Sequence, residues 1–539
     1  MILTLLSLPL ILVATVAPIV IRLYRAVYHH RQRKALMHSK GILRPPWNIN
    51  SVSPLAYPWL MILNIKAFAQ DRLFSEVARI VASDGRATSR AIIFQRKIIC
   101  TIEPENIKTM LATEHMSWSY STAQSRALEV CFGRGIFSAN GADWKLCRTV
   151  ISPCFSPARV NNTERLERHV SRLISQIPRD GATVDLSALF YRFTLDSMTE
   201  YFLGEGTCAL SRVDEPHLFG DSLGRSLVNA SCYVALPFSL PFSLLTNQVK
   251  HTRRMHKFLD ERVQGVLARR QELLAQRPKP SNRDSLIEAL VRESDDAHRI
   301  RSQALHVLFA SRETSGALLS NLWFFLSRHA DVWHKLQAEV ATLKGQEPSH
   351  TQVEGLKYLR AVIDEVLRLQ PIVPYQEKMA VEDTMLPRGG GPDGSAPTFV
   401  KKGEVVAWLL TAMHRRRDFY GDDADDFRPE RWLDDEATGA KALRPGWEYV
   451  PWNGGAHSCL GQQLGYMTAA YATVRLCQFY DRVESRVDGR WREHSSSITM
   501  NIGGGKVGLF ARDMAKQETA AVRVDDGDEK RSAGAQIAI

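Results

Sequence analysis

The 539-residue sequence predicts a mainly α-helical protein with small β-sheets, preceded by one N-terminal transmembrane helix. Helical periodicity dominates from about residue 66 to residue 380. Strand-like alternation is local and falls in Ala91–Thr101 and Thr398–Leu410. A long uncharged run at the N-terminus predicts the membrane helix. The helical patterns lie at Ile80–Val81, Leu166–Ile174, Phe258–Leu274, Ala304–Arg328 and Val353–Leu369.

The N-terminal run contains no charged side chain between Ile2 and Ile21, and about 20 apolar residues span a bilayer as a helix. A cleaved signal peptide is the alternative, but no Lys or Arg precedes the run, and the small-residue site Val16-Ala17 is followed by Pro18. The positive-inside rule places the remaining chain in the cytosol, because basic residues follow the run at once. They are Arg22, Arg25, Arg31, Arg33 and Lys34.

Composition divides the chain into four regions. We expect a transmembrane anchor at 1–22, a basic and proline-rich linker at 23–65, a folded domain at 66–513 and a disordered tail at 514–539. Residues 386–397 are expected to form a loop, since they are rich in glycine and proline. The apolar, proline-broken run 236–245 is expected to be core, with contact to the membrane as the alternative.

The formal net charge of +11 would suit nucleic acid, an anionic membrane surface or an acidic protein partner. Nucleic acid is the weakest of these partners, because no basic stripe interleaved with aromatic residues occurs. The eight cysteines show no CxxC pair and no zinc-ligand spacing. The sequence therefore indicates neither a disulfide framework nor a zinc site.

One cysteine lies in a glycine-rich segment. Residues 451–461 read PWNGGAHSCLG and precede a helix-like stretch, 462–476. Glycines let a backbone approach a flat cofactor closely, and the positive end of a following helix favours a thiolate at Cys459. Taken alone, a buried structural cysteine beside a turn is the simpler interpretation.

Three further patterns accompany this segment. Glu365 and Arg368 share one face of an amphipathic helix, where they can pair. Arg431, in the segment FRPERW, could extend the pair to a network. Glu313 and Thr314 interrupt the apolar stripe of a long helix, and they could form a satisfied polar pair or a proton relay.

The order and spacing of these elements resemble the cytochrome P450 superfamily over roughly residues 45–512. Trp144 and Arg148 look like the WxxxR motif of that family, whose helix holds the haem propionates. Several stretches are similar to the fungal microsomal branch that hydroxylates alkanes and fatty acids. They are Gly135–Phe137, Phe193–Ser197, Leu386–Gly394, Ala412–Arg416 and Cys459–Gln463.

The resemblance implies the cytochrome P450 fold and a haem b (heme b) cofactor whose iron is ligated by the Cys459 thiolate. It also implies that Glu313 and Thr314 order water and deliver protons. The residues implied to lie around the haem are Trp144, Arg148, Lys378, Trp452 and His457. Those implied to form a structural network behind the haem are Glu365, Arg368 and Arg431.

The sequence departs from the family pattern at four of its positions. Trp452 stands where the family usually has Phe, and Ser311 stands where it usually has Gly. His457 and Lys378 each replace a usual arginine. A histidine can give a propionate one hydrogen bond, whereas an arginine binds it with two.

By this resemblance we expect a monooxygenase that oxidises a lipophilic substrate with O2, in fungal secondary metabolism. Electrons would come from NADPH through the membrane-bound NADPH-cytochrome P450 reductase, docked on a basic face. The catalytic domain would face the cytosol from the endoplasmic reticulum membrane. Alternatives are a fatty-acid or alkane hydroxylase of primary metabolism, a haem-thiolate isomerase or dehydratase, and a non-catalytic haem sensor. Thr314 argues against the isomerase, and the anchor with the basic face argues against the sensor.

Overall fold

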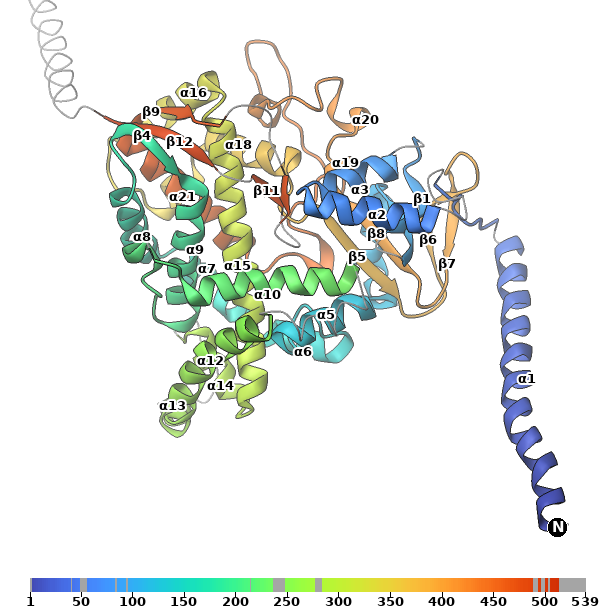
Figure 1. Cartoon of the computed structure of the whole chain (residues 1–539). Coiled ribbons are helices and arrows are strands. Elements are labelled where there is room, and N and C mark those ends of the chain that lie inside the picture. Colours follow the sequence, from blue (N-terminus) through green and yellow to red (C-terminus); the bar gives the residue numbers. More distant parts are fainter. Residues whose placement is uncertain are drawn as a thin grey trace, which may run out of the picture.

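The computed structural model describes residues 2–39, 41–48, 56–82, 85–93, 96–213, 215–235, 248–276, 284–487, 493–495, 500–502 and 505–512. Helices form most of the described chain (Figure 1). They are α1 (Ile2–Ser39), α2 (Ala56–Ala69), α3 (Leu73–Ala82), α4 (Pro104–Lys108), α5 (Thr122–Phe132), α6 (Gly141–Ile151), α7 (Pro157–Val160), α8 (Glu164–Ser175), α9 (Leu186–Leu203), α10 (Leu218–Ala235), α12 (Gln248–Leu267), α13 (Arg270–Gln276), α14 (Leu286–Glu293), α15 (Ala297–Leu326), α16 (Ala330–Ala341), α17 (His350–Glu354), α18 (Lys357–Leu369), α19 (Leu410–Met413), α20 (Arg417–Tyr420) and α21 (Gln462–Phe479).

The strands form four small sheets in the described chain. They are β1 (Thr88–Ile93), β2 (Arg96–Thr101), β3 (Trp118–Ser119), β4 (Asp180–Asp185), β5 (Tyr375–Ala380), β6 (Thr384–Gly390), β7 (Ala396–Val400), β8 (Val405–Leu409), β9 (Tyr480–Ser485), β10 (Glu493–Ser495), β11 (Met500–Ile502) and β12 (Lys506–Ala511). The largest sheet has the order β1-β2-β8-β5-β3, and only β2 and β8 pair in parallel in it. The predicted class of mainly α with small sheets is therefore confirmed.

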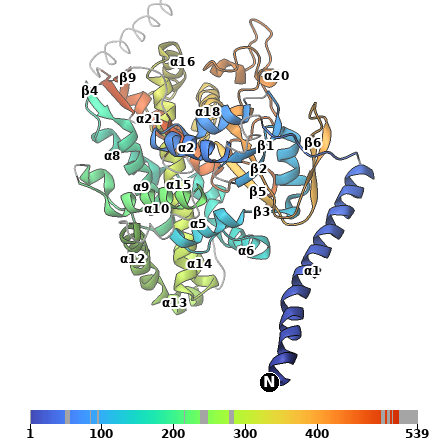
Figure 2. The same ribbon diagram turned by 45° about the vertical axis from the view of Figure 1, so that its right-hand side comes forward.

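The long helix α15 runs through the middle of the molecule (Figures 1 and 2). It begins at Ala297, seven residues before the predicted start, because the Asp296 carboxylate accepts hydrogen bonds from the amides of His298 and Arg299 and so caps the helix. Most side chains of its C-terminal half are buried. A helix surrounded by protein on all sides can hold catalytic groups in fixed positions.

Two predicted helices are divided in the structure. The pattern Phe258–Leu274 covers α12 and α13, which are separated at residues 268–269. The pattern Val353–Leu369 covers α17 and α18. Periodicity alone did not reveal these breaks, because the apolar spacing continues through both of them.

The strand predictions succeeded at Ala91–Thr101, which covers the second half of β1 and all of β2, and at Thr398–Leu410, which contains β8. The loop predicted for 386–397 is wrong, since most of it belongs to the antiparallel hairpin of β6 and β7. The pairing shifts register between Leu386 and Gly390, and Gly389 has a φ of 102°. A glycine-rich strand can include such an irregularity, which a side chain would strain.

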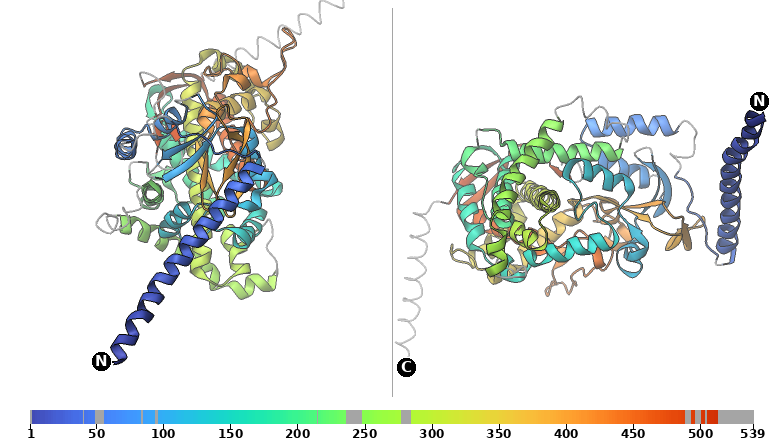
Figure 3. Two further views of the ribbon diagram at one scale, coloured as in Figure 1. Left: turned by 90° about the vertical axis from the view of Figure 1, so that its right-hand side faces the viewer. Right: turned by 90° about the horizontal axis from the view of Figure 1, so that it is seen from below.

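Helix α1 extends away from the body of the molecule in every view (Figures 1, 2 and 3). It continues through Ser39, past the predicted end of the anchor at residue 22, and Arg33 near its end forms an ion pair with Asp383 at 2.7 Å. Within the described residues, no helix combines the length and apolarity needed to cross a membrane. The apolar run 236–245 and the predicted tail 514–539 lie outside the described residues.

Candidate active site

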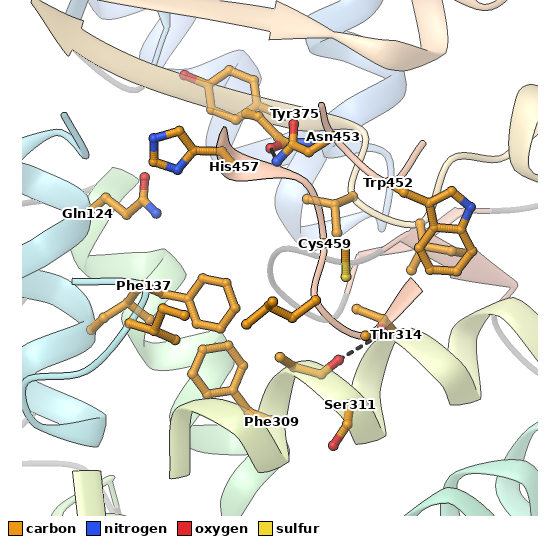
Figure 4. A pocket seen from close by; sticks show the side chains of 18 of the residues that line it. Gln124, Phe137, Phe309, Ser311, Thr314, Tyr375, Trp452, Asn453, His457 and Cys459 are labelled. Carbon is orange, nitrogen blue, oxygen red and sulfur yellow. Dashed lines mark hydrogen bonds between the residues drawn. The ribbon is translucent and has the colours of Figure 1, made fainter. Parts of the chain in front are cut away.

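A cavity of about 520 Å³ lies between α15 and the segment that carries Cys459 (Figure 4). Helices α5, α6 and α10 and strand β5 contribute further walls. Most of the lining is apolar, including Leu128, Phe137, Leu227 and Phe309. Such a cavity suits a large apolar ligand held by a few polar groups.

Cys459 lies where the glycine-rich segment meets the start of α21, and its sulfur points into the cavity (Figure 4). Its backbone amide donates to the Trp452 carbonyl at 2.9 Å, which closes the segment on itself. Burial raises the pKa of the Cys459 thiol, whereas the Gly461 amide and the Arg148 guanidinium act in the opposite direction. The cysteine therefore presents its sulfur to the cavity, and the raised pKa means that a bound cation would be needed to stabilise the thiolate.

Cationic side chains gather at one end of the cavity. Arg148 of α6 donates to the Ser458 carbonyl at 2.9 Å. The Lys378 ammonium lies 3.8 Å from the ring centroid of Tyr120 and has no hydrogen-bond partner among the described residues. Because Lys378 is buried, its pKa is lowered to about 7. A buried, unpartnered ammonium beside an arginine indicates a place for an anionic group.

Trp144, Trp452 and His457 also line this cavity. The rings of Trp144 and His457 lie 4.4 Å apart, and burial together with the Lys378 and Arg148 charges lowers the pKa of His457 to about 3. His457 is therefore neutral at physiological pH and can supply one hydrogen bond, as its sequence position suggested. Trp452 packs against Gly465, where a Cβ would lie 3.4 Å from the indole ring.

The two predicted proton-relay residues of α15, Glu313 and Thr314, have different surroundings in the structure. Thr314 lines the cavity, and its hydroxyl donates to the Ala310 carbonyl at 2.6 Å (Figure 4). Glu313 is absent from the lining; it is buried and forms an ion pair with Arg312. Ser311 lines the cavity too, and its hydroxyl donates to the Leu308 carbonyl at 3.2 Å.

The predicted network of Glu365, Arg368 and Arg431 is present as a buried cluster. Arg368 donates to both oxygens of Glu365 at 2.8 Å, and Arg431 donates to one of them at 2.8 Å. Trp432 completes the cluster through an indole hydrogen bond of 2.9 Å to Glu365. Arg368 also donates to backbone carbonyls, among them that of Ala424 at 2.6 Å. Arg431 has a second anionic partner, the Asp423 carboxylate, at 3.4 Å.

Sequence reasoning missed several lining residues. Tyr120 faces Lys378, and Gln124 points into the cavity beside His457 (Figure 4). Phe137 and Phe309 form an aromatic wall with ring centroids 5.5 Å apart. Phe137 belongs to the stretch Gly135–Phe137, which was already noted for its similarity to the fungal branch of the family, so the sequence could have indicated it as a site residue. Tyr120 and Gln124 carried no distinguishing pattern.

The helical body, the buried ion-pair cluster and a cysteine facing α15 across an apolar cavity together define a haem-thiolate protein. The family model of Cytochrome P450 matches residues 53–508, and the chain belongs to this family. Its members bind haem with a cysteine thiolate as the axial ligand and act as monooxygenases. The residues present fit that group, because the cavity offers a sulfur and, at one end, a buried cation without a partner for the propionates.

Curated relatives of similar length support the family. Cytochrome P450 monooxygenase himC of Aspergillus japonicus is 35% identical over 91% of this chain and 87% of its own. Cytochrome P450 monooxygenase fsdH of Fusarium heterosporum is 34% identical over 80% of this chain and 77% of its own. Cytochrome P450 52-E3 of Starmerella bombicola is 33% identical over 86% of this chain and 90% of its own.

Proposed function

We propose that the chain is a membrane-bound monooxygenase that oxidises an uncharged lipophilic substrate with O2, with Cys459 as the iron ligand. The observation that carries the proposal is the Cys459 sulfur facing α15 across an apolar cavity. When bound, the haem supplies the oxidising chemistry that inserts oxygen into an unactivated C–H bond. The protein supplies the ligand, the shape of the cavity and the protons.

Arg148 and Lys378 would hold the propionates, helped by Trp144 and a single hydrogen bond from His457. Arg148 is already oriented by its bond to the Ser458 carbonyl, so it can reach a carboxylate without losing its position. A propionate beside Lys378 would give the buried ammonium the hydrogen-bond partner that the described residues do not provide. This arrangement favours the protonated form of Lys378 once haem is present.

Thr314 would hold a water or the reacting oxygen by rotating its hydroxyl from the Ala310 carbonyl toward the cavity. Glu313 would have to leave Arg312 before it could deliver a proton to the same place. The two residues therefore act in sequence, with Thr314 nearer to the chemistry.

Electrons would reach the site from NADPH-cytochrome P450 reductase. Helix α6 contacts the cysteine segment through Arg148 and Ser458, and it exposes Lys145 beside them. An exposed lysine next to the ligand loop suits an acidic flavoprotein, as does the net charge of +11.

Attachment to the endoplasmic reticulum membrane through the first residues is part of the proposal. The sequence supports it with the uncharged run Ile2–Ile21 and the basic residues that follow. Helix α1 also exposes large apolar side chains to its surroundings, among them Val20, Leu23 and Val27. Exposed apolar side chains along a projecting helix suit a lipid environment.

The lining favours an uncharged substrate. Among the described lining residues, Arg148 and Lys378 are the side chains that can carry a positive charge at physiological pH. Both lie at the end of the cavity where the propionates would bind. A fatty acid would find no further cation there to bind its carboxylate. We therefore place the enzyme in secondary metabolism, in agreement with the departures at His457 and Lys378, rather than among the fatty-acid hydroxylases.

The first test is spectroscopic. Cys459→Ala or Cys459→His should abolish the thiolate-type spectrum of the reduced, carbonyl-bound haem, and Cys477→Ala serves as the control because Cys477 is buried away from the cavity. Oxygen uptake with NADPH and reductase should then depend on lipophilic compounds, and methyl dodecanoate should stimulate it more than dodecanoic acid. Retention of the spectrum in both Cys459 variants would show that another group ligates the iron.

The second test separates a monooxygenase from a haem-thiolate isomerase or dehydratase. Thr314→Val should fold and bind haem but release NADPH-derived electrons as hydrogen peroxide, with coupled product reduced by about 10² or more. Ser311→Ala is the matched control, since its hydroxyl lines the same helix face one turn earlier and is bonded to a backbone carbonyl. Unchanged product per NADPH in Thr314→Val would mean that the hydroxyl only satisfies its own helix.

A further inference from the structure

A histidine of α15 lies directly behind the aromatic wall of the cavity. His306 is fully buried and does not itself line the cavity. Its ring faces the segment of residues 133–138, which connects α5 with α6. The segment carries Ile136 and Phe137, and both of these side chains do line the cavity.

Both ring nitrogens of His306 bind this segment. Nε2 donates to the Gly133 carbonyl at 3.0 Å, and Nδ1 accepts the Phe137 amide at 3.2 Å. One neutral tautomer satisfies both bonds, and burial lowers the pKa of His306 to about 4, which keeps the ring neutral at physiological pH. The histidine therefore fixes the backbone on either side of Gly135.

The ring also restrains the Phe137 side chain. The His306 and Phe137 rings are stacked, with centroids 6.0 Å apart and an interplanar angle of 13°. Phe309, one turn further along α15, lies 5.4 Å from His306 and 5.5 Å from Phe137. Phe137 thus contacts both the His306 and the Phe309 ring. Figure 4 shows Phe137 beside Phe309 at the wall of the cavity.

Two glycines allow this close approach. A Cβ at Gly135 would lie 2.6 Å from the His306 ring, so a side chain there would displace the segment. Gly133 has a φ of 78°, and a Cβ there would lie 2.0 Å from the Ser302 hydroxyl. The sequence Gly133-Arg134-Gly135 is therefore matched to the α15 face that carries Ser302 and His306.

The geometry points to His306 as a positioning residue that holds Phe137 in the cavity wall and thereby decides which part of a substrate faces the iron. This inference rests on the proposed function, and it deepens it by assigning substrate orientation to a residue that touches neither haem nor substrate. A loosened Phe137 widens the cavity that Thr314 also lines, so a bulky ligand gains new orientations while a small ligand is unaffected. In this inference His306 affects only the shape of the cavity and takes no part in the chemistry.

The experiment uses the full-length haem protein and two ligands of the ferric iron, imidazole and 4-phenylimidazole, titrated by visible difference spectra. In His306→Leu, which makes neither hydrogen bond, the ratio of the two dissociation constants should change about five- to tenfold, the equivalent of one hydrogen bond. The imidazole constant alone should stay as in the wild type. His306→Gln should change the ratio less than His306→Leu does, since its amide can both accept from Phe137 and donate to Gly133 but cannot replace the stacked ring.

A double-mutant cycle separates positioning from a general structural role. Phe137→Ala should shift the ratio by itself, and adding His306→Leu to Phe137→Ala should produce no further shift. With methyl dodecanoate as substrate, the ratio of hydroxylated regioisomers should follow the same pattern across the variants. Equal ratios in His306→Leu and the wild type, or additive shifts in the double variant, would overturn the inference.

The controls keep the two proposals distinct. If His306→Leu does not fold, the double-mutant cycle is run with His306→Gln instead, and a shift in the ratio that adds to that of Phe137→Ala would contradict the inference. A wild-type protein without the thiolate-type spectrum would refute the proposed function instead. A wild-type protein with that spectrum and no oxidised product would leave the imidazole titrations as a valid test of His306.

Discussion

His306 in α15 and His414 after α19 are fully buried, and burial lowers the pKa of His306 to about 4 and that of His414 to about 3. Between pH 6.5 and pH 4 the unfolded chain takes up a proton at each histidine, whereas the folded chain takes up little at either. The free energy of unfolding is therefore highest above pH 6.5 and falls as the pH is lowered through this window. His306 contributes at most about 3 kcal/mol to the fall.

Urea unfolding at pH 7 and at pH 4.5 checks this expectation. His306→Gln should reduce the difference between the two pH values, because glutamine does not titrate. Part of the pH dependence of the free energy of unfolding should remain in that variant, because His414 is still present. An unchanged difference in His306→Gln would mean that His306 becomes protonated in the folded chain well above pH 4.

Among the elements, helix α18 carries Glu365 and Arg368, the centre of the buried ion-pair cluster. Glu365→Ala removes the shared carboxylate. It leaves Arg368 buried without its anion and Arg431 with only the more distant Asp423 carboxylate, so we expect a loss of about 3–5 kcal/mol in the free energy of unfolding. Glu76→Ala is the matched control: Glu76 pairs with Arg79 at the same i, i+3 spacing on α3, but 64% of the Arg79 side chain is exposed. Its loss should be below about 1 kcal/mol. Similar losses in both variants would show that the buried cluster contributes no more to the free energy of unfolding than an exposed ion pair does.

The elements also show what sequence patterns could and could not predict. The strands around Ala91–Thr101 and the long helix were predictable, because alternation and periodicity persist over many residues. The hairpin at 384–400 was not, because its glycines are typical of turns and its pairing is set by tertiary contacts. The spacing of Glu365 and Arg368 indicated that they can pair, and the resemblance implied a network with Arg431, whereas Trp432 joins them through a contact that no local pattern encodes.

The same limit applies to the site. Cys459, Thr314 and the cations at Arg148 and Lys378 were predicted and do line one cavity. Glu313 was predicted beside Thr314, but adjacent residues on a helix point about 100° apart, and Glu313 faces Arg312 instead. The aromatic wall depends on a long-range contact between α15 and the segment before α6, so a single sequence could not show its geometry.

For the whole molecule, the projecting position of α1 leads to a prediction about location. Deleting residues 2–34 should release most of a folded haem protein from the membrane fraction, which fractionation with immunoblotting would measure. The deletion also removes the ion pair of Arg33 with Asp383, but about a third of each side chain is exposed, so the effect on stability should be small. The single variant Arg33→Ala controls for that loss.

Partial retention would be consistent with a second contact through the run 236–245. Complete retention of the truncated protein in the membrane pellet would contradict the assignment of residues 1–22 as the main anchor.

The lone ammonium at Lys378 has a consequence for the life of the protein in the cell. Without haem, the folded chain keeps a buried amine that has no hydrogen-bond partner among the described residues and that water would solvate better. We therefore expect the empty form to open, and to meet proteases, more often than the loaded form. Haem binds only the folded state and draws the population toward it by mass action. The abundance of this enzyme would then follow the supply of its cofactor, with surplus chains degraded whenever haem synthesis slows.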